Sequence, residues 1–167
     1  MKIMITLGAI SLFIAAVALA QDTGNARAKR QVTLHEEMGP AADIMAKWDT
    51  DTNAVKSLEG LRRVAIEDGA LLESARPHLK KAAELWSGDT SPTSLVCRQS
   101  VYTMLDLMNE YLTVQIDKKN LLLNSDLSTP EGFKKLRHDL LPITARENAT
   151  INKRNAFLAT DSFSMTR

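Results

Sequence analysis

The chain has 167 residues, of which 44% are hydrophobic and 25% are charged, as in an ordinary single globular domain. Its 21 Lys and Arg residues are nearly balanced by 20 Asp and Glu residues, so no net field attracts nucleic acid or an anionic membrane, and neither is an expected partner. The single cysteine, Cys97, excludes an internal disulfide and a c-type haem, which needs two cysteines beside a histidine.

Residues 1–20 have the order of a secretory signal peptide. Met1-Lys2 gives a positive start, an apolar run follows, and Ala18-Leu19-Ala20 places small residues where a signal peptidase cuts. An uncleaved anchor is the alternative, because an apolar run of about 18 residues can just span a bilayer. The polar residues after Ala20 favour cleavage. We therefore expect an exported protein, periplasmic or extracellular, with no membrane span after cleavage and a disordered start at residues 21–27.

Helices are predicted throughout the mature chain, because no run shows the alternating pattern of a strand. The first helix spans about residues 26–48, and Gly39-Pro40 should either kink it or divide it into two shorter helices. It ends in a turn at residues 49–53 that caps the next helix. Its apolar stripe comprises Leu34, Met38, Ala41, Met45 and Trp48. The second helix spans about residues 54–86 and contains Pro77. Its stripe alternates steps of three and four residues: Leu58, Leu61, Ala65, Asp68, Leu72, Ala75, Leu79, Ala82 and Trp86.

The third helix, about residues 93–124, follows a Gly- and Pro-containing loop at residues 87–92. Its apolar face includes Cys97, Val101, Met104, Met108, Leu112, Ile116 and Leu123. The fourth helix, about residues 130–160, is expected to start with a capping Ser or Thr before Pro130 and to bend at Pro142. Its face is marked by Phe133, Leu136, Leu140, Ile143, Ile151 and Leu158, and residues 161–167 form a frayed tail.

The predicted fold class is therefore all-α. Four long helices form an antiparallel up-down-up-down bundle over residues 28–160, with kinks at the prolines. The short connections make neighbours in sequence neighbours in space. Closing the four apolar faces on one another would remove each of them from water.

No catalytic constellation is found, so neither an enzyme activity nor a cofactor is predicted. A di-iron bundle needs Glu-x-x-His on two helices, and the sequence contains none. There is no Gly-x-Ser-x-Gly elbow and no Gly-rich phosphate loop. A copper site could use Met38, Met45, Met104 and Met108 with His35, but methionines at helical spacing are more typical of core packing.

Polar side chains interrupt the predicted apolar stripes. They are Asp68, Arg98, Asn109, Glu147 and Arg154. Because a buried unpaired charge is costly, interior residues of this set would have to pair, for example Asp68 with Arg98 or Arg154, in a polar layer. The other interpretation is that proline kinks rotate the helix faces and leave these residues at the solvent boundary.

The function that we expect is binding of another protein by an exported helical bundle. An inhibitor or immunity-type protein and an accessory factor of an envelope assembly are two forms of this hypothesis. The alternative is a small-ligand sensor or carrier that uses the polar layer. A filled interior with an apolar patch outside would favour the first, and an internal cavity lined by the polar residues would favour the second.

Overall fold

The computed structural model describes residues 25–86 and 92–159, and the side chains of residues 36–84 and 101–159. Four helices account for nearly all of this part: α2 (Asn25–Ala54), α3 (Leu58–Trp86), α4 (Pro92–Asn124) and α5 (Pro130–Ala159). The described residues contain no strand. The predicted all-α class and the four helices are confirmed. The signal segment, the tail at 161–167 and most of the predicted loop at 87–92 lie outside the described residues.

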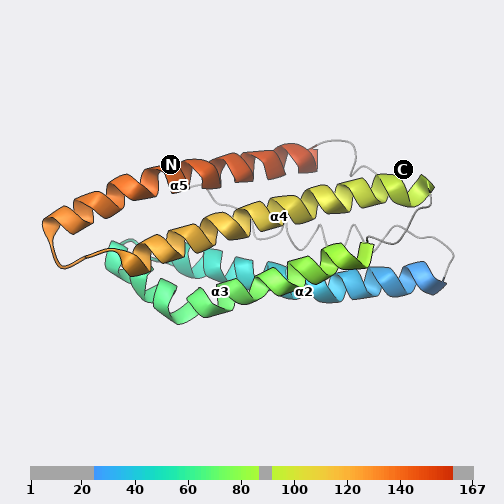
Figure 1. Cartoon of the computed structure of the whole chain (residues 1–167), viewed down its shortest axis with the longest axis horizontal. Helices are drawn as coiled ribbons and strands as arrows, with labels where there is room; N and C mark the ends of the chain where they lie inside the picture. Colours follow the sequence, from blue (N-terminus) through green and yellow to red (C-terminus); the bar gives the residue numbers. More distant parts are fainter. Residues whose placement is uncertain (1–24, 87–91, 160–167) are drawn as a thin grey trace.

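The four helices lie lengthwise beside one another (Figure 1). The colours show that α2 and α4 run from right to left in this view and that α3 and α5 run from left to right. The main contacts join helices that are consecutive in the chain: α2 with α3, α3 with α4, and α4 with α5. As a result, α3 and α5 begin at the same end of the molecule.

The first helix is longer than the sequence suggested. The turn predicted at residues 49–53 is wrong, because α2 continues to Ala54. The hydroxyls of Thr50 and Thr52 donate to the carbonyls of Ala46 and Trp48, each at 2.8 Å, so residues that favour turns are satisfied inside the helix. The next helix takes its cap from Ser57, whose Oγ accepts the backbone N–H of Gly60 at 3.1 Å.

The prolines do not end the helices. Pro40, Pro77 and Pro142 lie inside α2, α3 and α5. Two shorter helices meeting at Gly39-Pro40 are therefore excluded, whereas the kink expected there and the kinks expected at the other prolines stay predictions. Similarly, α2 begins at Asn25, within the segment 21–27 that the sequence suggested as a disordered start.

The core is built mainly by α2, α3 and α4. It contains the predicted stripe residues Met38, Ala41, Met45, Trp48, Ala65, Leu72, Ala75, Leu79, Ala82, Val101, Met104, Leu112 and Leu136, together with Val64, Leu105 and Leu122. The methionines of the copper hypothesis that are described thus lie in or against the core. In α5, only Leu136 and Thr150 are buried among the thirty residues. The fourth helix therefore lies on the outside of a three-helix core.

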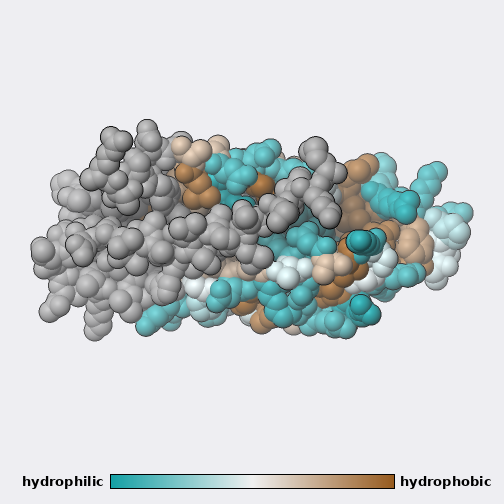
Figure 2. All heavy atoms as spheres, turned by 180° about the vertical axis from the view of Figure 1, so that it is seen from behind, coloured by the Kyte–Doolittle hydropathy of each residue, from teal (hydrophilic) through white to brown (hydrophobic). Residues whose placement is uncertain are grey.

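The described surface is mostly hydrophilic on the face shown in Figure 2, with separate hydrophobic areas. One of these lies near the end where α3 and α5 begin. Among the described side chains, the large apolar residues Ile66, Leu71 and Leu141 are well exposed. Among the described helices, none is long and apolar enough to cross a bilayer.

Candidate functional site

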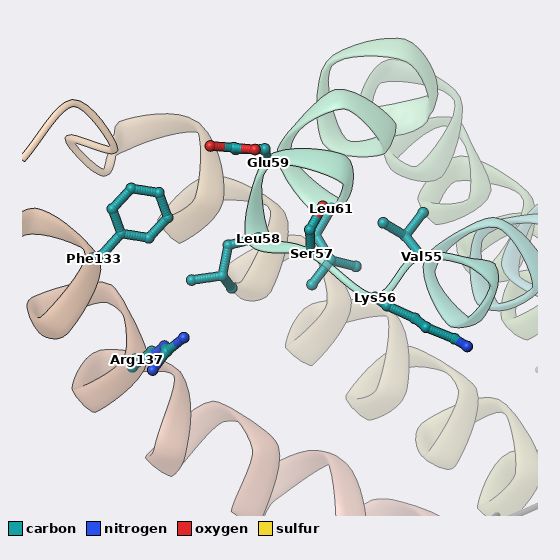
Figure 3. Close-up of a pocket in the computed structure, with 8 residues that line it drawn as sticks. All are labelled: Val55, Lys56, Ser57, Leu58, Glu59, Leu61, Phe133 and Arg137. Atoms are coloured by element: carbon teal, nitrogen blue, oxygen red, sulfur yellow. The ribbon is translucent and has the colours of Figure 1, made fainter. Parts of the chain in front are cut away.

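An open hollow of about 510 Å³ lies at the end of the molecule where α3 and α5 begin (Figure 3). Both helix starts are fixed by caps. Ser57 caps α3, and Thr129 Oγ1 accepts the backbone N–H of Gly132 at 3.1 Å at the start of α5. The lining residues are Val55, Lys56, Ser57, Leu58, Glu59, Leu61, Phe133 and Arg137. The hollow is thus shared by two helices that are far apart in the sequence.

Two glycines permit the close chain approaches beside this hollow. A Cβ atom on Gly60 would lie 2.1 Å from Val55 Cγ1. A Cβ atom on Gly132 would lie 1.9 Å from the backbone oxygen of Asp126. Since no real Cβ atom tolerates such a distance, a side chain at position 60 would require the Val55 side chain to move, and one at position 132 would require the backbone to move.

The hollow combines an apolar floor with charged edges. Val55, Leu58 and Leu61 pack against the core but stay partly accessible. Figure 3 shows Leu58 lying between the start of α3 and the side chains of Phe133 and Arg137 on α5. Within the described residues, neither Lys56 nor Arg137 has an ion-pair partner. The arrangement suits an apolar group with a negative charge close by.

A buried hydrogen-bond network joins α2, α4 and α5 further along the bundle. Trp48 Nε1 donates to Gln115 Oε1 at 3.0 Å, and Gln115 Nε2 donates to Glu147 Oε1 at 2.8 Å. Lys118 Nζ also donates to Glu147, with 3.2 Å to Oε2. Trp48 and Gln115 are each only 1% exposed, so the network satisfies polar groups that water cannot reach.

Asp49 and Tyr111 form a partly buried pair next to this network. The Tyr111 hydroxyl donates to Asp49 Oδ1 at 2.6 Å. Burial raises the pKa of Asp49 to about 6 and outweighs the hydrogen bond from Tyr111, which lowers it. The charge of Glu147 raises this pKa further, while Lys118 and Arg154 lower it. Burial, followed by the charge of Asp49, also raises the pKa of Tyr111.

The structure brings two of the residues predicted for a polar layer into the same neighbourhood. The charges of Glu147 and Arg154 both shift the pKa of Asp49. The Nε atom of Arg154 is buried and has no hydrogen-bond partner among the described residues. Asp68 instead pairs with Lys47, across the contact between α2 and α3. It is therefore Lys47, and not Arg154, that balances the charge of Asp68.

The other two predicted residues take no part in this network. Asn109 is half-buried, and its backbone carbonyl accepts the Thr113 hydroxyl at 2.8 Å. The side chain of Arg98 lies outside the described residues. None of the four predicted layer residues whose side chains are described lines the hollow.

Several residues of both sites were missed by the sequence reasoning. Gln115 lies three residues after Leu112, which is the correct spacing for the buried stripe of α4. Because Gln115 is polar, the apolar Ile116 was assigned to the stripe in its place. Asp49 fell in the predicted turn. The hollow depends on how α3 and α5 meet, and no local pattern signals that.

The described residues contain no group of three His, Cys, Asp or Glu side chains that could hold a metal ion. No family model matches the chain, and comparisons with curated proteins and with solved structures found no similar protein. The chemistry of the hollow and of the buried network therefore provides the basis for a functional proposal.

Proposed function

We propose that the chain is an exported helical protein that acts by binding another protein, and that the partner docks at the hollow between the starts of α3 and α5. The hollow carries the proposal because its floor is apolar and accessible while Arg137 at its edge lacks an ion-pair partner among the described residues. A partner would place an apolar side chain on Leu58 and Phe133 and an acidic group near Arg137.

The filled interior of the bundle supports this choice. Large side chains such as Trp48, Leu72 and Leu112 are at most 1% exposed, and the buried polar groups of Gln115 are hydrogen-bonded. An inhibitor of immunity type and an accessory factor of an envelope assembly would both bind their partner through the outer surface of the bundle. Export rests on the signal-like residues 1–20.

The test is a capture experiment with the mature chain, residues 21–167, as bait in an extract of its source. Phe133→Ala and Arg137→Glu alter the hollow. Leu141→Ala and Lys135→Glu make comparable changes on α5 outside it, because Leu141 is 66% exposed and Lys135 does not line the hollow. We expect the first pair of variants to lose a stoichiometric partner that the control pair retains. Equal loss from both pairs, or from neither, would contradict docking at the hollow.

A small-ligand carrier is the second candidate, and one observation favours it. The volume of the hollow lies within the range of roughly 300–1,000 Å³ that is usual for ligand pockets. Native mass spectrometry of the purified chain distinguishes the two functions. A bound small molecule that Phe133→Ala releases and Leu141→Ala retains would favour the carrier, whereas a chain of unmodified mass together with a captured protein would favour the binding function.

A further inference from the structure

The contact between α4 and α5 contains two exposed ion pairs in addition to the buried bonds of Glu147 to Gln115 and Lys118. Lys153 Nζ lies 2.8 Å from Glu110 Oε1, and Arg146 NH1 lies 2.8 Å from Asp117 Oδ2. These four side chains are all more than 40% exposed, so salt screens their attraction.

The hydrophobic contribution of α5 is small by comparison. Only Leu136 and Thr150 of this helix are buried, and its main contact is with α4. The closed arrangement also leaves Arg154 Nε buried without a partner among the described residues, which water would satisfy if the helix moved away. Separation of α5 would break the buried bonds of Glu147 to Gln115 and Lys118. It would nevertheless expose fewer fully buried apolar side chains than separation of any of the three core helices.

The face of α4 beneath α5 has an apolar centre. Leu107 and Val114 are buried, yet neither belongs to the main core cluster. They lie three or four residues from Glu110 and Asp117, so helical spacing places all four on one face of α4. Because Glu110 and Asp117 bind α5, this face is directed toward α5.

We infer that α5 is a displaceable helix, and that the face of α4 around Leu107 and Val114 is an interaction surface for an amphipathic helix of another protein. The incoming helix would carry apolar residues for Val114 and basic residues for Glu110 and Asp117, as α5 itself does with Lys153 and Arg146. Its binding would also remove one wall of the hollow, since Phe133 and Arg137 belong to α5. The inference does not depend on a partner at the hollow.

Hydrogen exchange followed by mass spectrometry tests whether α5 opens separately. In the full mature chain, we expect amides of residues 130–159 to exchange before those of α2, α3 and the second half of α4, and the difference to grow with NaCl concentration. The double substitution of Arg146→Glu and Lys153→Glu should accelerate exchange in α5 about three- to tenfold, because two exposed ion pairs usually contribute that much to the stability of a contact. Lys80→Glu is the control, because Lys80 pairs within α3. Exchange of all helices as one unit, unaffected by the double substitution, would overturn the inference.

A peptide of residues 130–159 tests the surface itself. In the wild-type chain, the tethered α5 competes with the added peptide for the face of α4, at an effective concentration of about millimolar. A fluorescent peptide should therefore bind the wild-type chain weakly. The chain carrying Arg146→Glu and Lys153→Glu repels its own α5 but keeps Glu110 and Asp117, and it should bind the wild-type peptide about tenfold more tightly. A peptide with the same two substitutions is the matched control. Failure of the wild-type peptide to bind the variant chain, or equal binding of both peptides, would overturn the assignment of this surface.

Discussion

At the scale of single residues, Asp49 is a group whose protonation affects stability between about pH 4 and pH 7. Its pKa in the folded protein is about 6, above the ordinary value of 3.8, because its carboxylate is buried. A raised pKa means that the folded state holds the proton more tightly than the unfolded state does. The resulting stabilisation is complete below about pH 3.8 and is lost as the pH rises through about 6.

Asp49→Asn should therefore stabilise the protein at pH 7.5, by about 1–3 kcal/mol, and should have little effect near pH 4. The amide oxygen can still accept the Tyr111 hydroxyl, so the hydrogen bond is kept. Urea unfolding of the wild type and the variant at pH 4.5, 6 and 7.5 measures the difference. Asp43→Asn, on the exposed side of the same helix, is the control. A difference between Asp49→Asn and the wild type that does not change with pH would contradict this assignment.

Gln115 is the residue that connects three helices. Gln115→Leu should reduce the free energy of unfolding by about 1–3 kcal/mol, because it leaves the Trp48 indole N–H buried without an acceptor. Trp48→Phe in the same chain removes that orphaned donor. The double variant should accordingly lose less than the sum of the two single losses, as a double-mutant cycle by chemical denaturation would show. Strictly additive losses would mean that the hydrogen bond contributes nothing.

These residues show where reasoning from the sequence reached its limit. The stripe of α4 was predicted correctly up to Leu112 and was then assigned to Ile116 and Leu123. The buried positions after Leu112 are instead Val114, Gln115, Lys119 and Leu122. A polar residue at a core spacing cannot be recognised without its partner, and the partner of Gln115 is 67 residues away in the chain. Lys119 is buried because Gly69 on α3 leaves space for its methylenes and Glu73 binds its amino group.

At the scale of elements, the start of α5 was easier to predict than the end of α2. Pro130 and its preceding capping residue marked the start of α5 correctly, since capping chemistry is local. The end of α2 was placed too early because Asp and Thr at residues 49–53 resemble a turn. In the structure, Thr52 bonds back to Trp48, and Lys47 pairs with Asp51 one helical turn away at 2.8 Å.

The connection between α4 and α5 should be sensitive to a single methyl group. Gly132→Ala would place a Cβ atom 1.9 Å from the backbone oxygen of Asp126, so the start of α5 must shift. We expect a loss of about 1–3 kcal/mol in the free energy of unfolding. Gly39→Ala is the matched control, because an added Cβ atom there meets nothing within 4 Å. Thermal unfolding followed by circular dichroism compares the two, and equal midpoints would contradict the crowding seen at Gly132.

At the scale of the whole molecule, hydrophobic periodicity was sufficient to predict four helices and most of the core. It could not predict that α5 lies outside a three-helix core, because its apolar residues recur at helical spacing as they do in the other helices. Most of these residues, such as Leu140 and Phe157, are only partly buried against α4 and the core. Because α5 lies outside the core, its contact with α4 includes exposed ion pairs, and a hollow remains between the starts of α3 and α5.

The most direct measurement of the central claim is photo-crosslinking in the source cells. A benzophenone amino acid replaces Phe133 at the hollow in one chain and the well-exposed Leu141 in another. We expect a discrete crosslinked protein of higher mass from position 133 and none from position 141, and mass spectrometry would identify it. A crosslink from position 141 alone, the same product from both positions, or no product from either would contradict binding of a partner at the hollow.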